Sequence, residues 1–128
     1  MTKHTILIVD DDPLILNTLK KRFETWETEV FAAATPEEAK AILEKTTPDA
    51  LILDLLLTSE DGSSGIMDYM KSQQRLQDIP IIILTNLDKP ELKKMLLEQG
   101  VKEYLIKGSL DLDDLHNKVM GYLEPKGE

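Results

Sequence analysis

The chain has 128 residues, of which 41% are hydrophobic and 30% charged, with a formal net charge of −9 and no cysteine. This composition indicates one ordinary globular domain and excludes disulfides, thiol nucleophiles and cysteine-based zinc sites. The acidic balance argues against direct nucleic-acid binding, which needs clustered Lys and Arg. No apolar stretch approaches the roughly 20 residues that span a bilayer, and no apolar leader opens the chain. We therefore expect a cytoplasmic protein without membrane contact.

Short apolar runs alternate with segments of helical period along the chain, which is the pattern of a parallel α/β fold. The expected strands are residues 5–9, 29–33, 50–54, 79–84 and 103–106. The expected helices are residues 13–26, 36–45, a segment carrying Ile66, Tyr69 and Met70, a segment from about 89 to 99, and a last one from 109 or 110 to about 123. Residues 58–65 are polar and are expected to form a loop.

Helix boundaries are marked by familiar capping residues. Thr35 precedes Pro36 and two glutamates, which is the pattern of an N-cap, a proline in the first turn and a favourable helix dipole. Gly100 is placed to end a helix. The acidic residues Asp111, Asp113 and Asp114 lie at a helix start, where the dipole favours them.

Strands and helices in this order make a doubly wound five-stranded parallel sheet with five helices, because right-handed crossovers leave few topologies. The flavodoxin-like strand order 2-1-3-4-5 has its switch point between the first and third strands, where ligands bind beyond the strand ends. We expect one domain over residues 1–128, with a core from about 4 to 124.

Four aspartates follow the two strands that flank this switch point. Asp10, Asp11 and Asp12 end the first apolar run, and Asp54 ends the third. Parallel neighbours would bring Asp10, Asp11 and Asp54 into one crevice, where the crowded negative charge needs Mg²⁺ or a proton. Asp12, directly before Pro13, is assigned to the helix start.

Thr85 and Lys107 end the fourth and fifth strands and would border the same crevice. This set of groups suits phosphoryl transfer to a carboxylate. Asp11 and Asp54 could bind Mg²⁺, Lys107 and Thr85 could contact the phosphoryl oxygens, and Asp54 could attack phosphorus.

The residues at these strand ends resemble the motifs of response-regulator receiver domains, and the resemblance covers nearly the whole chain. The matching segments are Ile-Leu-Ile-Val-Asp-Asp-Asp-Pro (6–13), Leu-Ile-Leu-Asp-Leu (51–55), Ile-Ile-Ile-Leu-Thr (81–85) and Gly-Val-Lys-Glu-Tyr-Leu-Ile-Lys (100–107). The resemblance implies a phosphorelay protein in which Asp54 accepts phosphate from a sensor histidine kinase or a phosphotransfer protein.

The resemblance also implies a metal site with Mg²⁺ as cofactor. In it, Asp11 and Asp54 bind the ion, Asp10 acts mainly through water, and the carbonyl of Leu56 completes the protein ligands.

A conformational switch is implied as well. Thr85 would be drawn to the phosphoryl group, Tyr104 would turn inward, and Lys107 would pair with the phosphoryl oxygens. The domain would not be an enzyme in the ordinary sense, although it would catalyse its own phosphorylation and slow dephosphorylation.

Three features depart from the family pattern. Leu57 and Thr58 replace a usual Met-Pro pair, and about three extra residues lengthen the following loop. Gly108 replaces the proline after Lys107, so a trans peptide bond or a strained cis bond is expected there. Asn86 follows Thr85 in place of a small residue. With Leu56 it is expected to restrict the approach of hydrolytic water and to prolong the phosphorylated state.

Two other functions remain open. A pseudo-receiver would bind proteins without phosphotransfer. A haloacid-dehalogenase-type phosphatase also uses an Asp-x-Asp motif, which Asp10 and Asp12 fit, but it needs a late acidic pair. Considered without the other motifs, Thr85 could be an ordinary turn residue and Lys107 a charged residue exposed to solvent. Tyr104, considered in the same way, could be a half-buried packing residue. His4 and His116 are expected at the surface.

The chain ends with Glu124-Pro125-Lys126-Gly127-Glu128, directly after the last expected helix. A stand-alone regulator is expected, although an excised receiver would have the same sequence. Its output would be protein binding through the surface of the fourth helix, fifth strand and fifth helix, as a monomer or weak dimer.

Overall fold

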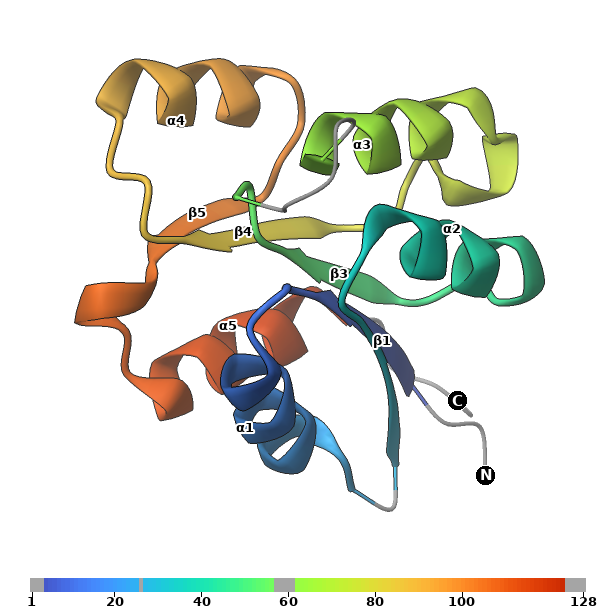
Figure 1. Cartoon of the computed structure of the whole chain (residues 1–128), viewed down its shortest axis with the longest axis horizontal. Coiled ribbons are helices and arrows are strands. Elements are labelled where there is room, and N and C mark those ends of the chain that lie inside the picture. Colours follow the sequence, from blue (N-terminus) through green and yellow to red (C-terminus); the bar gives the residue numbers. More distant parts are fainter. Residues whose placement is uncertain (1–3, 26, 57–61, 124–128) are drawn as a thin grey trace.

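The computed structural model describes residues 4–25, 27–56 and 62–123. Its centre is a parallel sheet in the order β2-β1-β3-β4-β5, which confirms the predicted topology. The strands are β1 (His4–Val9), β2 (Thr28–Ala33), β3 (Ala50–Leu53), β4 (Ile81–Thr85) and β5 (Glu103–Ile106). The chain order reverses between β1 and β3, as Figure 1 shows, so the switch point lies where the sequence predicted it.

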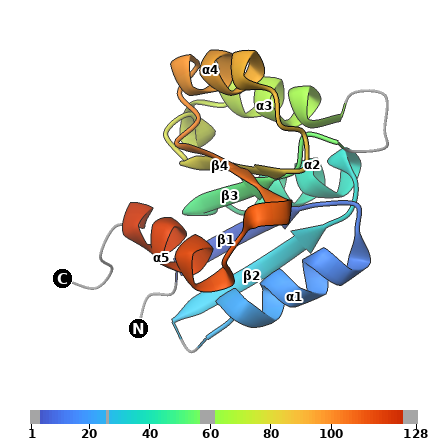
Figure 2. The same ribbon diagram turned by 90° about the vertical axis from the view of Figure 1, so that its left-hand side faces the viewer.

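Helices cover both faces of the sheet (Figures 1 and 2). They are α1 (Pro13–Phe23), α2 (Pro36–Lys45), α3 (Gly62–Ser72), α4 (Pro90–Glu98) and α5 (Leu112–Tyr122). Two short 3₁₀ turns, η1 (Gln74–Leu76) and η2 (Lys107–Ser109), follow α3 and β5. Helices α1 and α5 lie on one face, while α2, α3 and α4 lie on the other.

Alternate side chains of the strands supply two separate cores. In β1, Ile6 and Ile8 pack with Phe23 of α1 on one face, while Leu7 and Val9 face the other core. All four of these strand residues are at most 1% exposed. Burial on both faces explains why the strand is a continuous apolar run rather than an alternating one.

The capping predictions are confirmed. Asp12 is the N-cap of α1, where its side chain accepts a 2.9 Å hydrogen bond from the Leu14 amide. Thr35 caps α2 through the Glu38 amide at 3.1 Å. Gly100 has φ +107°, a conformation that a side chain disfavours, and ends the turn after α4.

Helix α1 ends at Phe23, three residues before the predicted end at residue 26. The Thr25 and Thr28 backbones bond to each other at 3.1 and 3.4 Å, which starts β2 at Thr28 instead of residue 29. This reciprocal pairing turns the chain out of the helix. Trp26 lies outside the described residues.

Helix α3 begins at Gly62, so the predicted loop over residues 58–65 is wrong in its last four positions. Glycine and serine have low helix propensity, but the following turns bury Ile66 and Met70 in the core. Residues 57–61 lie outside the described part of the chain, and with them the loop residues Thr58, Glu60 and Asp61.

Two further boundaries differ from the prediction. Strand β4 runs from Ile81 through Thr85 instead of over residues 79–84, since Pro80 has no amide to donate to a neighbouring strand. Helix α5 starts at Leu112 because Asp111 caps it, accepting from the Asp113 and Asp114 amides at 2.8 and 3.2 Å. The described residues hold no helix that is long and apolar enough to cross a bilayer.

The guanidinium of Arg75 closes the C-terminal end of α2, a contact that the sequence did not predict. One nitrogen donates to the carbonyl of Leu43, and the other to the Thr46 carbonyl at 3.3 Å and the Thr47 hydroxyl at 2.9 Å. Arginine thereby satisfies carbonyls that have no partner within the helix.

We expect Arg75→Ala to lower the free energy of unfolding by about 1.5 kcal/mol, because charged hydrogen bonds to the helix end are lost. Urea unfolding measures this difference. Lys45→Ala is the matched control, since Lys45 is an exposed cation in the last turn of the same helix. Equal losses in the two variants would mean that charge alone matters and that the hydrogen bonds contribute nothing.

Candidate functional site

Two neighbouring strands place two buried aspartates side by side. Val9 and Leu53 are paired residues of β1 and β3, and Asp10 and Asp54 directly follow them. The Asp54 amide donates to the Val9 carbonyl at 3.0 Å, which extends the strand pairing by one residue. Asp10 is 2% exposed and Asp54 is 4% exposed. Two carboxylates at this depth need partners, because an isolated buried charge is costly.

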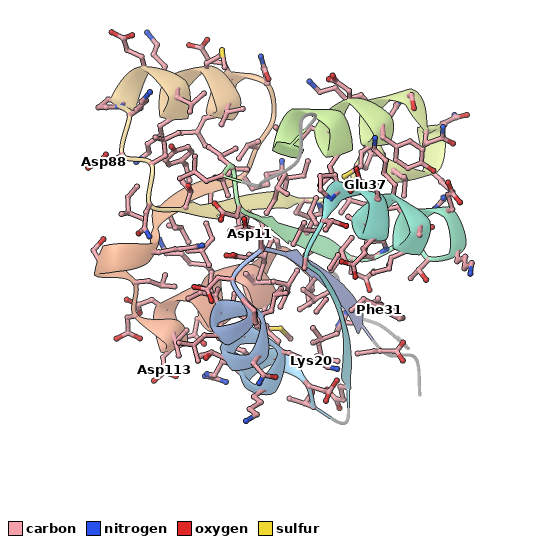
Figure 3. All side chains as sticks on the ribbon, in the orientation of Figure 1. Asp11, Lys20, Phe31, Glu37, Asp88 and Asp113 are labelled. Carbon is pink, nitrogen blue, oxygen red and sulfur yellow. The ribbon has the colours of Figure 1, made fainter. Side chains whose placement is uncertain are left out.

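Asp11 joins this pair to form an acidic cluster at the switch point. Asp10, Asp11 and Asp54 each offer one carboxylate oxygen, and these oxygens all lie within 4.8 Å of one another. Figure 3 labels Asp11 at this end of the sheet, between β1 and α1. The donor set consists of hard oxygen atoms, which fits a Mg²⁺ ion. Asp12 lies outside the cluster, on the helix cap, as the sequence predicted.

Lys107, directly after β5, supplies a positive charge to the cluster. Its ammonium nitrogen lies 2.5 Å from an oxygen of Asp10 and 3.1 Å from an oxygen of Asp54, and its side chain is 14% exposed. The expectation that Lys107, considered alone, is a charged residue exposed to solvent is therefore wrong. The described residues contain no cis peptide bond, so the Lys107–Gly108 bond is trans. Lys107 is the first residue of the η2 turn, and its side chain extends from there to Asp10 and Asp54.

Backbone amides hold the second oxygen of each buried aspartate. Oδ1 of Asp54 accepts from the Leu56 amide at 3.1 Å, and Oδ1 of Asp10 accepts from the Asp12 amide at 2.9 Å. Both bonds are turns in which an aspartate binds the backbone two residues on. They fix the orientation of the carboxylates, a feature that sequence reasoning missed although Asp favours such turns.

The site couples the ionisation of its members. Burial raises the pKa of Asp10, and the hydrogen bonds from Lys107 and the Asp12 amide only partly oppose this. Burial lowers the pKa of Lys107, but hydrogen bonds and charge attraction from Asp10 and Asp54 outweigh it, so the pKa of Lys107 is raised. Its contribution to stability is thus present below pH 10.5 and is lost as the pH rises above that value.

Thr85 and Tyr104 meet at the backbone of one residue, Leu87. The Thr85 hydroxyl oxygen accepts from the Leu87 amide at 3.2 Å, and the Tyr104 hydroxyl donates to the Leu87 carbonyl. Thr85 is fully buried and Tyr104 is 5% exposed, so the half-buried packing expected for Tyr104 alone is wrong. Burial raises the pKa of Tyr104. The negative charge of Asp88, which is labelled in Figure 3, raises it further.

Leu56 and Asn86, the residues expected to restrict access, are both exposed; Leu56 is 51% exposed. The amide oxygen of Asn86 lies 3.9 Å from the position that a Cβ on Gly108 would take. Two departures from the family pattern therefore lie beside each other at the rim.

The two histidines were expected at the surface, and both are partly buried rather than fully exposed. The His4 side chain is 15% exposed, and its Nδ1 lies 4.0 Å from Asp49. The ring of His116 stacks against Phe23 with centroids 5.2 Å apart. They lie on different elements, α5 and β1, and neither is in the acidic cluster.

A doubly wound parallel sheet with buried acids after β1 and β3 and a lysine after β5 places these groups at the switch point, where such folds bind their ligands. The sequence model of the response regulator receiver domain matches residues 6–120, and the chain belongs to this family. Receiver domains are signalling domains of two-component systems rather than enzymes. This membership argues against the phosphatase alternative, and the cluster leaves out Asp12, which that alternative requires.

Relatives of the chain are named as regulators. It is 33% identical over 107 residues, 84% of its length, to "Probable transcriptional regulator ycf27" of Porphyridium aerugineum, of which it covers 43%. It is 30% identical over 118 residues, 92% of its length, to "DNA-binding dual master transcriptional regulator RpaA" of Synechocystis, of which it covers 48%. The chain thus spans less than half the length of these two relatives, and the DNA binding named for RpaA is not transferred to it.

Solved structures share the fold. The receiver domain of Francisella response regulator 1452 superposes with a TM-score of 0.81 at 28% identity, covering 94% of this chain and 96% of that one. The chemotaxis response regulator CheY4 of Vibrio cholerae gives 0.83 at 24% identity, covering 95% of this chain and 100% of that one. At 24% identity, the similarity to CheY4 shows a shared fold and nothing more.

Proposed function

We propose that this chain is a phospho-accepting receiver domain, extending over the whole of its 128 residues, in a cytoplasmic two-component phosphorelay. Asp54 takes a phosphoryl group from a sensor histidine kinase or a phosphotransfer protein. One observation carries the proposal: Asp54 is buried at the switch point, 3.1 Å from the Lys107 ammonium and in one cluster with Asp10 and Asp11. Buried carboxylates in this arrangement suit phosphoryl transfer.

Asp11 and Asp54 would hold Mg²⁺ directly, Asp10 would act through water, and the Leu56 carbonyl would be a further ligand. The ion, when bound, neutralises charge on the incoming phosphoryl group. The carboxylate set fits this role, because its oxygens converge within 4.8 Å and, among the described residues, the Lys107 ammonium is the one cation paired with Asp10 and Asp54.

In the transfer step, one carboxylate oxygen of Asp54 forms a bond to phosphorus. The bond from phosphorus to the donor's imidazole nitrogen breaks, and its electron pair stays with the imidazole. The product is an acyl phosphate on Asp54. The Leu56 amide holds the carboxylate in place during attack, and the Lys107 ammonium, already 3.1 Å from Asp54, pairs with the added phosphoryl oxygens.

Switching would follow from the bonds to Leu87. When the Thr85 hydroxyl turns to a phosphoryl oxygen, it gives up its 3.2 Å contact with the Leu87 amide. The Tyr104 hydroxyl is bonded to the carbonyl of the same residue, so a shift of Leu87 changes what holds Tyr104. The change would reach a protein partner on the α4, β5 and α5 surface, with the domain itself a monomer or weak dimer and no nucleic acid bound.

The test is exposure of the protein to acetyl phosphate and Mg²⁺, followed by intact-mass measurement. We expect an adduct of about 80 Da on the wild type and none on Asp54→Asn, an isosteric variant that lacks the nucleophilic charge. No adduct on the wild type would support the pseudo-receiver alternative. An adduct retained by Asp54→Asn would move the acceptor to another residue, and rapid turnover of a phosphomonoester would restore the phosphatase alternative.

Asn86 is proposed to prolong the phosphorylated state together with Leu56. We expect Asn86→Ala to shorten the half-life of the acyl phosphate by about threefold, because a smaller side chain at the rim admits hydrolytic water more easily. The decay of the adduct mass after removal of acetyl phosphate gives this half-life. Asn117→Ala, on an exposed residue of α5, is the control of the same type. An unchanged or longer half-life for Asn86→Ala would contradict the proposal.

A further inference from the structure

The connection between β5 and α5 is held at both ends by packing against the two cores. Ile106, the last residue of β5, packs against the core on the α2, α3 and α4 face, and Leu110 packs against the core on the α1 and α5 face. The residues between these two anchors, Lys107–Ser109, form the η2 turn, which is the short coil between β5 and α5 in Figure 1. Because both anchors are fixed, a change of backbone conformation at one residue of the turn has to be compensated at the others.

The η2 turn sets the backbone of Lys107. Ile106 is extended, with φ −98° and ψ 124°, and Lys107 directly after it is the first residue of the 3₁₀ turn. The turn is closed by the Leu110 amide, which donates to the Lys107 carbonyl at 3.3 Å. From this position the ammonium lies 2.5 Å from Asp10 and 3.1 Å from Asp54. The conformation of the turn therefore decides where the lysine side chain starts and which carboxylates it reaches.

Gly108, in the middle of the turn, does not use the conformational freedom of glycine. Gly100 is the glycine with a positive φ among the described residues. A Cβ on Gly108 would lie 3.9 Å from the side-chain oxygen of Asn86, which is an ordinary van der Waals distance. Alanine would therefore fit at this position. Proline would not, because its ring disfavours a helical backbone at the preceding residue, which here is Lys107.

We propose that residue 108 is a positioning residue that acts through Lys107. A residue that leaves the η2 turn intact keeps the ammonium on Asp10 and Asp54, whereas a proline at this position withdraws it. The positioning rests on the contacts of Lys107, and only its effect on phosphoryl transfer rests on the proposed function.

Two backbone amides report whether the ammonium is in place. The Asp12 amide donates to Oδ1 of Asp10 at 2.9 Å, and the Leu56 amide donates to Oδ1 of Asp54 at 3.1 Å. The Lys107 ammonium pairs with the other oxygen, Oδ2, of both carboxylates. Removal of the cation changes the charge on the acceptor of each amide, so the NMR signals of these two amides in ¹⁵N-labelled protein are the readout.

We expect Gly108→Pro to shift both reporter signals toward the positions that they take in Lys107→Met, and Gly108→Ala to leave both in place. The Thr5 amide is the control, since it donates to the Asp49 carboxylate at 2.7 Å at the opposite end of β1. Its signal is expected to stay unchanged in all variants. Reporter signals that stay in place in Gly108→Pro, or that move no more than the Thr5 signal, would overturn the proposal.

A double-variant comparison separates positioning from simple support of the fold. In urea unfolding, we expect Gly108→Pro to lower the folding equilibrium constant of the wild type by about tenfold or more, because two buried carboxylates lose their cation. In the Lys107→Met background the same change is expected to lower it by less than about threefold, since that cation is already absent. Gly108→Ala is expected to raise it by about two- to fivefold, as at other positions where alanine fits the backbone.

Equal factors for Gly108→Pro in the two backgrounds would make residue 108 a structural residue and reject the proposal. If Gly108→Pro does not fold by itself, the Lys107→Met background decides. A double variant as stable as Lys107→Met supports the positioning role, and a double variant that is also unfolded rejects it.

The rate of adduct formation with acetyl phosphate and Mg²⁺ tests the consequence for phosphoryl transfer. We expect Gly108→Pro to react at least about fivefold more slowly than Gly108→Ala, because the ammonium is no longer placed to pair with the phosphoryl oxygens. If the wild type forms no adduct, the proposed function fails, while the reporter amides still decide the positioning. Equal rates in the two variants, with an adduct formed, would reject the role of the turn in transfer.

Discussion

Lys107→Met is expected to lower the free energy of unfolding by about 3 kcal/mol in the absence of Mg²⁺, because it leaves two buried carboxylates without their cation. The lysine lies 2.5 Å from Asp10 and 3.1 Å from Asp54, and these acids are 2% and 4% exposed. Methionine keeps the length of the apolar stem, so the loss reports the charge rather than a cavity. Chemical denaturation at neutral pH measures it.

Lys102→Met is the control for this experiment, since it removes an exposed lysine just before the same strand. We expect a loss within about 0.5 kcal/mol for the control, as for other surface substitutions. Added Mg²⁺ is expected to restore part of the stability of Lys107→Met, because a cation again faces Asp10 and Asp54. If both variants lost the same small amount, the ammonium would not be needed to hold the acids.

Asp11→Asn is expected to weaken Mg²⁺ binding by about tenfold or more, because one of three converging carboxylates is neutralised. The proposed Mg²⁺ site is formed only in the folded chain, so saturating metal should raise the melting temperature of the wild type by about 3–6 °C. The variant should lose most of this rise at the same Mg²⁺ concentration. EDTA should return the wild type to its metal-free melting temperature and slow the formation of the acetyl phosphate adduct.

The neighbouring Asp12→Asn supplies the matched control. Asp12 is the N-cap of α1 and is not part of the acidic cluster, and asparagine is an equally good cap. We expect its melting temperature to rise with Mg²⁺ as in the wild type. An equal loss of the Mg²⁺ response in both variants would show that overall negative charge, rather than the cluster, attracts the ion.

Local sequence signals were sufficient for much of the fold. Asp12 and Thr35 cap their helices through backbone groups two and three residues away, and Gly100 ends its turn through its own φ. Such contacts depend on near neighbours, so composition and spacing predict them. The continuous apolar runs predicted the strands of the sheet, because strands that are buried on both faces carry few polar residues.

Other features needed contacts between distant residues. The start of α3 at Gly62 is set by packing of Ile66 and Met70, against the weak helix propensity of the residues before them. The Arg75 cap joins η1 to the end of α2, about 30 residues away in the sequence.

The sequence by itself determined the parallel sheet, its strand order and the set of strand ends that carry Asp10, Asp54, Thr85 and Lys107. It could do so because alternation of strands and helices, with one handedness of crossover, leaves few arrangements. Only the tertiary structure decided that Lys107 contacts both acids through a trans peptide, and that Thr85 and Tyr104 meet at Leu87. Distances between side chains from different strands depend on the packing of the whole domain, which a linear pattern does not specify.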